Sequence, residues 1–183
     1  MEAINLIGTH IVQAVNDPVE ESYDALMFAG MLAGIGFGNA GCHLPHGMSY
    51  AVAGLVKNYS PEGWPTDHNM VPHGISVIVN SPAVFRKTGP ACAERHWKAA
   101  AAMGADLTDT KVEDGGNILA EQILGMMRET GIPNGLSGVG YSVDDLDALT
   151  DRSYAQKRLI DNGPMPISRD ELKELFSDAM TYW

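Results

Sequence analysis

Apolar residues in this chain recur every three or four positions, and this spacing limits the fold more than any other feature of the sequence. Near the N-terminus the pattern is Ile4, Ile7, Ile11 and Val15, which is the period of an amphipathic helix. No apolar–polar alternation lies between hairpin turns, as it would in a half-buried strand pair. We therefore expect an all-α fold.

Helix boundaries are predicted from start and stop signals. Asp17-Pro18 separates the first two helices, and Pro18 suits the first turn of the second. Ser168 with Glu171 three residues later forms a capping box for the last helix. Other start signals are Ser142 and either Thr110 or Asp114. The predicted helices cover residues 3–15, 18–41, 47–56, 72–79, 91–103, 114–129, 143–154 and 169–180, with a loop over 58–65.

Two segments need a further argument. The β-branched run at residues 77–79 suits a strand by propensity, but its length and the preceding Pro-His-Gly favour a helix. Four glycines inside the second predicted helix each cost about 1 kcal/mol of helix propensity relative to alanine. We expect another backbone to pack closely there. These glycines are Gly30, Gly34, Gly36 and Gly38.

Composition excludes several classes of partner. The 183 residues include 23 acidic and 12 basic side chains, for a formal net charge of −11. This balance argues against binding to nucleic acid or to an anionic membrane. No apolar run reaches the ~18–20 residues of a membrane span, and the first residues lack the basic start of a secretory signal. Cys42 and Cys92 form no CxxC, which suits a reducing, cytoplasmic location. The length suits one domain, residues 1–183.

Four of the six histidines fall in two short stretches, residues 38–50 and 67–76. His46 and His73 each follow a proline, precede a glycine and begin a predicted helix. Neutral imidazole is a common metal ligand, so two helix starts that pack side by side would bring both rings to one ion. A catalytic metal usually takes three or four protein groups, so the sequence gives half a site. The other histidines are open candidates near the motif (His43, His68) or predicted surface residues (His10, His96).

The sequence around these histidines contains A-G-I-G-F-G-N-A-G-C-H-L-P-H-G-M-S-Y, then D-H-x-x-V-P-H-G-I-S-V and S-P-A-V-F. These motifs resemble the iron-containing (group III) alcohol dehydrogenases, and most of all their hydroxyacid–oxoacid transhydrogenase branch. The later E-R-H, M-G-A-D and V-G-Y-S also fit. The resemblance implies a dehydroquinate synthase-like fold with an N-terminal NAD(P)-binding α/β domain and a C-terminal helical domain that supplies metal ligands. This chain resembles only the C-terminal domain.

The resemblance also implies roles for single residues. In the family one aspartate and three histidines bind the metal, and the second and third histidines match His46 and His73. The upstream D-x-x-x-H is missing, and the chain is expected to start after it. Where many members have a further histidine near the nicotinamide and substrate, this chain has Tyr50, whose hydroxyl is predicted to hydrogen-bond a substrate oxygen. The implied cofactors are a divalent metal, iron before zinc, and NAD(P) bound by the missing domain.

Three functions remain open from the sequence. The first is the metal-binding helical half of a metal-dependent, NAD(P)-linked dehydrogenase or transhydrogenase for a small alcohol, aldehyde or hydroxyacid, inactive as an isolated chain. The second is a catalytically silent helical interaction or oligomerisation module. The third is a metal-storage or sensing protein that uses His43, His46, His68 and His73. A missing domain would leave apolar surface exposed, including parts of residues 31–50, so we expect a homo-oligomer.

Overall fold

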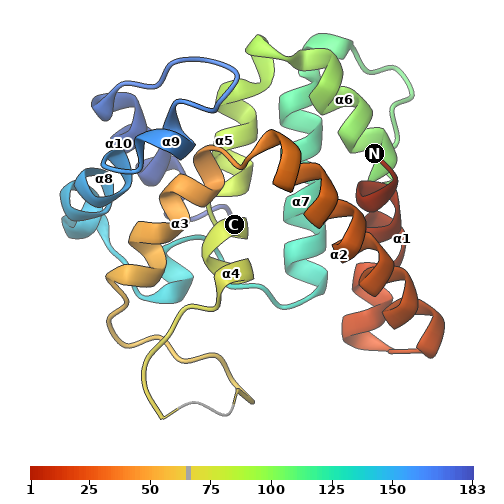
Figure 1. Cartoon of the computed structure of the whole chain (residues 1–183), viewed down its shortest axis with the longest axis horizontal. Helices are drawn as coiled ribbons and strands as arrows, with labels where there is room; N and C mark the ends of the chain where they lie inside the picture. The colour runs from red at the N-terminus through yellow and green to blue at the C-terminus, as the bar shows by residue number, and fades with distance from the viewer. Residues whose placement is uncertain (65–66) are drawn as a thin grey trace. The chain divides into compact units, whose positions relative to one another are not determined.

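A computed structural model describes residues 1–64 and 67–183. Pro65, the last residue of the predicted loop, therefore lies outside the described residues. Within them all regular structure is helical, which confirms the all-α prediction (Figure 1). The helices are α1 (Glu2–Asn16), α2 (Glu20–Ala40), α3 (Leu44–Gly54), α4 (His73–Ile78), α5 (Ser81–Thr88), α6 (Ala93–Ala102), α7 (Gly115–Glu129), α8 (Leu146–Tyr154), α9 (Lys157–Ile160) and α10 (Arg169–Asp178). They form two compact units, Met1–Gly41 with Phe85–Gly131 and Cys42–Val84 with Ile132–Trp183.

Several boundaries differ from the prediction. Pro18 lies outside α2, which begins at Glu20 because the Ser22 hydroxyl donates to the Val19 carbonyl at 2.7 Å and closes the first turn there. The third helix begins at residue 44 rather than 47, because Pro45 fits its first turn, where a backbone N–H is not needed. The short helices α5 and α9 were not predicted. The residues 72–79 form a helix and no strand, as predicted.

The first unit contains α1, α2, α6 and α7, with α1 packed along α2 and α6 against α7. Glycine is required where α7 begins: a Cβ on Gly115 would lie 2.5 Å from the Ala93 carbonyl oxygen, and one on Gly116 would lie 2.5 Å from that of Phe85. The close packing predicted for the glycines of α2 is wrong. Because that part of α2 is largely exposed, no described residue comes within 4 Å of a Cβ built at Gly30, Gly34, Gly36 or Gly38.

His96 is buried in the first unit, so its prediction as a surface residue is wrong. Its side chain is 7% exposed, and its Nδ1 lies 3.0 Å from the Cys92 carbonyl oxygen. A carbonyl only accepts, so a hydrogen bond there places a proton on Nδ1, and Nε2 lies 3.1 Å from the Thr88 hydroxyl. Burial raises the pKa of the neighbouring Cys92 thiol. His96 is therefore a buried residue with contacts to Thr88 and Cys92 within its own unit.

His10 also departs from the surface prediction. It is half-buried in α1, and its Nδ1 is buried without a hydrogen-bond partner among the described residues. The error at His96 has a local cause, because the charged neighbours of a helical residue in sequence lie on other faces of the helix. A charged sequence context therefore does not place a histidine at the surface.

The second unit packs α3 against α4, α8 and α9, and α8 against α10. The hydroxyl of Tyr141, a buried residue, donates to the Val52 carbonyl at the end of α3, 2.6 Å away. Burial, helped by the Asp145 carboxylate, raises the pKa of Tyr141 to about 12, so this phenol stays protonated. The largest fully buried side chains of this unit are Leu44, Met48, Val52, Val79, Leu136, Leu149, Ile160, Leu172, Leu175 and Phe176.

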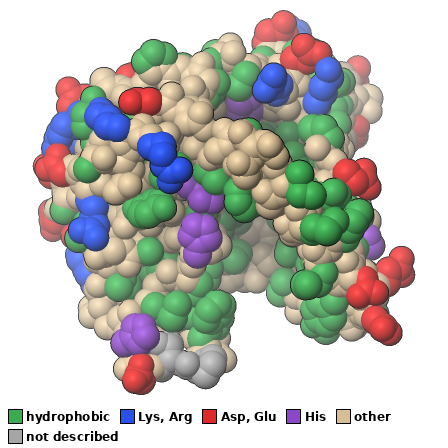
Figure 2. Space-filling model, viewed as in Figure 1, with side chains coloured by type: hydrophobic (Ala, Val, Ile, Leu, Met, Phe, Trp, Pro, Cys, Tyr) green, Lys and Arg blue, Asp and Glu red, His purple; other side chains and the backbone are tan. Residues whose placement is uncertain are grey.

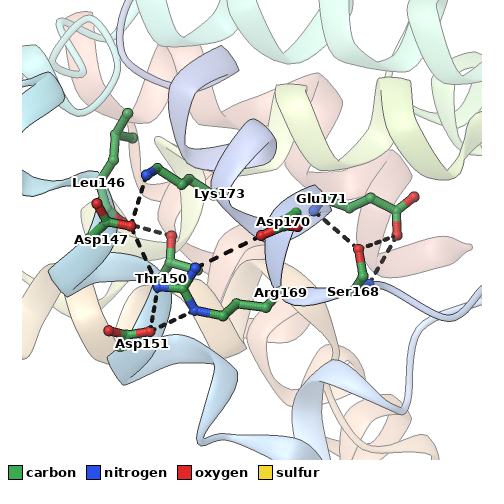
Figure 3. A network of polar contacts seen from close by, with 9 residues as sticks. All are labelled: Leu146, Asp147, Thr150, Asp151, Ser168, Arg169, Asp170, Glu171 and Lys173. Atoms are coloured by element: carbon green, nitrogen blue, oxygen red, sulfur yellow. Dashed lines mark hydrogen bonds and ion pairs between the residues drawn. The ribbon is translucent and has the colours of Figure 1, made fainter.

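A polar network joins α8 to α10 (Figure 3). The predicted capping box is confirmed, since the Glu171 N–H donates to Ser168 Oγ at 3.2 Å and the Ser168 N–H donates to Glu171 Oε2 at 2.9 Å. Asp147 on α8 accepts from Lys173 at 2.8 Å and from Arg169 at 3.4 Å. Exposed ion pairs contribute only about 0–1 kcal/mol each. The network therefore selects the register of α10, whereas burial of its apolar side chains stabilises it.

α2 carries the largest run of exposed apolar side chains. Six of them are between 50% and 77% exposed: Tyr23, Met27, Phe28, Met31, Ile35 and Phe37. Figure 2 shows apolar side chains where α2 runs across the face in view. Among the described helices, none alone is long and apolar enough to cross a membrane; α2 and α3 pass that test only as a bent pair, by length and composition.

Candidate metal centre

Two segments of the second unit share the pattern Pro-His-Gly-x-Ser, at residues 45–49 and 72–76. Each lies at the beginning of a helix, α3 or α4. In both, the serine hydroxyl donates to the carbonyl of the histidine three residues earlier: Ser49 to His46 and Ser76 to His73, each at 2.8 Å. The serines are 2% and 0% exposed. The same buried hydrogen bond therefore fixes the first turn that carries each imidazole.

Sequence reasoning singled out the Pro-His-Gly parts of these segments and missed Ser49 and Ser76. The signal was present, because both serines stand three residues after their histidines. A serine inside a helix commonly bonds a carbonyl of the preceding turn when it is kept from water. The repeated spacing was therefore enough to indicate two matched helix starts.

The packing of α3 against α4 brings His46 and His73 together, as the sequence predicted. Their ring centroids lie 5.3 Å apart with the planes tilted by 54°. Figure 2 shows histidine side chains next to one another on the face in view. Two imidazoles that bind one tetrahedral ion at about 2.0–2.1 Å have their centroids roughly 5 Å apart. The observed separation fits a shared divalent ion.

The electrostatics of the pair favour the ligand form of His46. This side chain is half-buried, whereas His73 is exposed. Burial lowers the pKa of His46 below its ordinary value of 6.5, and the nearby His73 lowers this pKa further. Metal binding requires neutral imidazole. The surroundings therefore keep His46 neutral and able to bind at neutral pH.

The rest of a metal site does not lie near the pair. Among residues 1–64 and 67–183, no group of three or more His, Cys, Asp and Glu side chains is arranged to hold an ion. His43 precedes the first residue of α3, where its carbonyl accepts from the His46 N–H at 2.9 Å. His68 is 71% exposed, with Nδ1 2.9 Å from the Asp67 carboxylate. The structure thus brings together the two histidines that the sequence singled out, and within the described residues it does not gather four.

Tyr50 lies one helical turn after His46 on α3. Residues four apart on a helix share a face, so its side chain lies on the same side of α3 as the imidazole. The side chain is 48% exposed. A phenol hydroxyl in this place is accessible to a small molecule that approaches the histidine pair.

Comparison with known proteins agrees with these features. Residues 1–180 match the C-terminal part of the Fe-containing alcohol dehydrogenase family. The mitochondrial hydroxyacid-oxoacid transhydrogenase of Xenopus laevis is 42% identical over 179 residues, which are 97% of this chain and 39% of that protein. Its Homo sapiens counterpart is 39% identical over 181 residues, which are 98% of this chain and 39% of that protein.

Solved structures show the same fold. A crystal structure of 1,3-propanediol oxidoreductase superposes with a TM-score of 0.84 at 24% identity, over 97% of this chain and 43% of that one. The fold is thus that of the helical domain of a larger oxidoreductase. The chain belongs to the iron-containing alcohol dehydrogenase family, as the motifs predicted. It spans about two fifths of the length of the relatives that it matches.

Proposed function

We propose that this chain is the metal-binding helical half of a metal-dependent, NAD(P)-linked alcohol or hydroxyacid dehydrogenase or transhydrogenase. The observation that carries the proposal is the 5.3 Å separation of the His46 and His73 rings, one at the beginning of each Pro-His-Gly-x-Ser helix. Both imidazoles would hold a divalent ion, iron before zinc. The relatives' name, hydroxyacid-oxoacid transhydrogenase, supports a hydroxyacid as the substrate.

Each part of the site would have a separate task. A bound ion supplies Lewis acidity at the alcohol or carbonyl oxygen of the substrate, and a bound NAD(P) accepts or gives the hydride. His46 and His73 orient the ion through two fixed first turns. The Tyr50 hydroxyl donates a hydrogen bond to a substrate oxygen beside the pair. The further metal ligands and the nucleotide site would come from a preceding domain, so the isolated chain is inactive in our proposal.

The experiment follows the histidine ring signals of the 183-residue chain by NMR while Zn²⁺ is added. We expect the signals of His46 and His73 to shift together at weak affinity, with no NADH-dependent aldehyde reduction. His46→Ala and His73→Ala should each abolish the shift of the remaining partner. His68→Ala is the control, because that exposed side chain lies outside the pair. Full zinc binding by His46→Ala would remove this residue from the site, and turnover by the isolated chain would contradict the missing-domain proposal.

A second candidate function is supported by the exposed apolar side chains of α2. Large exposed apolar patches mark association surfaces, so we propose that the isolated chain forms a homo-oligomer through α2. Light scattering should give at least a dimer, and Met31→Glu with Ile35→Glu should return it to a monomer. A monomer at high concentration without these changes would exclude this function.

The cellular location stays a prediction. The relatives are named as mitochondrial, whereas the sequence predicted a cytoplasmic protein. Both cysteines, Cys42 and Cys92, are free thiols. We propose a reducing compartment, which fractionation of cells expressing the protein with its native upstream sequence would identify.

A further inference from the structure

Two residues, Val79 and Asn80, separate α4 from α5. An uninterrupted backbone ladder would join them into one helix, with each carbonyl bonded to the N–H four residues later. Two residues, Pro82 and Tyr182, interrupt this ladder. Pro82 has no N–H for the Ile78 carbonyl. The next pair in the ladder would be the Val79 carbonyl and the Ala83 N–H.

The side chain of Tyr182 occupies the place of that next hydrogen bond. Its hydroxyl donates to the Val79 carbonyl at 2.9 Å and accepts from the Ala83 N–H at 3.4 Å. A side chain that enters the ladder in this way interrupts the backbone hydrogen bonds of a helix. Tyr182 thus bridges the end of the helix that begins with His73.

Tyr182 is itself anchored through the backbone. The Asn134 side-chain oxygen accepts from the N–H groups of Tyr182, at 2.8 Å, and of Trp183, at 3.3 Å, while its amide donates to the Trp183 carbonyl. The Leu136 N–H also donates to the Ala179 carbonyl at 2.9 Å. The phenol is therefore fixed within the second unit rather than free to follow α4.

The contact from Tyr182 adds to the hydrogen bonds that the Asn80 and Ser81 side chains donate, at 2.7 and 3.1 Å, to the Ser76 and Val77 carbonyls at the end of α4, a helix that also packs against α3. α4 is six residues long, and Ser76 is its only residue that is fully buried. Helices this short are not stable by themselves, so their ends must be held by tertiary contacts. Holding the end of α4 at Val79 restrains the helix and with it the position of His73 at the opposite end.

We propose that Tyr182 is a positioning residue of the metal centre, because its hydroxyl bridges the break between α4 and α5 and so holds the end of the helix that presents His73 to His46. This inference rests on the proposed function of the histidine pair as metal ligands. The chemical requirement is strict, since metal–nitrogen bonds tolerate displacements of only about 0.2 Å. A rotation of α4 about its far end would separate the two rings without unfolding the unit.

The test compares Tyr182→Phe with Tyr141→Phe in the 183-residue chain. Tyr141 is the matched control, because its hydroxyl also donates to a backbone carbonyl of this unit, at the end of α3 and not of α4. Nuclear Overhauser effects between the ring protons of His46 and His73 measure the pair without any metal. We expect Tyr182→Phe to reduce them by more than half and Tyr141→Phe to leave them unchanged, although both lower the melting temperature.

The zinc affinity of the same variants is the second measurement. Loss of an outer-shell partner typically weakens metal binding about 10–100-fold, and we expect roughly tenfold for Tyr182→Phe. If zinc binds to the wild-type chain at a place that does not involve His46 and His73, the proposed function fails. The ring-proton measurement still decides the role of Tyr182 in that case. Should Tyr182→Phe not fold, Asn134→Ala, which keeps the hydroxyl but releases its anchor, is expected to show the same reduction. Unchanged ring-proton effects in a folded variant, or an equal loss in Tyr141→Phe, would overturn the inference.

Discussion

The two helices that carry the histidine pair begin alike and are stabilised differently. α3 and α4 both begin with Pro-His-Gly-x-Ser, and the serine-to-histidine hydrogen bond is 2.8 Å long in each. α3 is eleven residues long in all, and it buries Leu44, Met48 and Val52. α4 ends after six and depends on its junction with α5. One sequence pattern can thus produce the same first turn on a long, buried helix and on a short one held by contacts from outside it.

The largest difference should appear when an apolar side chain is removed from each helix. Met48→Ala is expected to lower the free energy of unfolding by about 2–5 kcal/mol, because the side chain is fully buried. Ile75→Ala in α4 removes a half-buried side chain, so we expect about 1 kcal/mol. Urea denaturation of both variants measures the contrast. Equal losses would mean that α4 is anchored by its own side chains.

The glycines after the two histidines should respond in opposite directions. A Cβ at residue 47 would lie 2.8 Å from Ile160 Cδ1, so Gly47→Ala should cost about 1–3 kcal/mol of stability. No described residue lies within 4 Å of a Cβ at Gly74, and alanine is the better helix former. We therefore expect Gly74→Ala to be neutral or to stabilise by up to about 1 kcal/mol. Thermal melts at one protein concentration would measure both shifts, and a large loss in Gly74→Ala would contradict an open position there.

The serines should show the smallest effect and the closest similarity. Ser49→Ala and Ser76→Ala each remove one buried donor to a histidine carbonyl, which is expected to cost about 1 kcal/mol. Denaturant midpoints measure both losses, and Ser60→Ala, at an exposed position on the loop after α3, is the control. If only one serine variant lost stability, the two helix starts would not be equivalent.

Local signals in the sequence were sufficient for most of the fold and for the histidine pair. Periodicity and capping residues predicted eight of the helical segments, and Ser168 with Glu171 marked the beginning of α10. α9 was missed because its four residues are too short to show a period. Within α6, His96 and Ala100 share the inward face one turn apart, a pairing that the neighbouring charged residues concealed.

Features that depend on distant parts of the chain were not predictable in this way. The Tyr182 hydroxyl reaches a carbonyl 103 residues earlier, and no local pattern indicates that contact. The glycines of α2 show the opposite error, because their spacing suggested a packed backbone that the described chain does not supply.

The most direct test of the central proposal is a double-mutant cycle on Zn²⁺ binding with His46→Ala, His73→Ala and the variant that carries both changes. In this proposal the 183-residue chain supplies only two ligands, so each single change should abolish most of its weak Zn²⁺ binding. If both imidazoles bind one ion, the double variant should lose little more than either single variant. Losses that add to within about 0.5 kcal/mol would mean that the two histidines act independently, and would contradict the shared metal centre.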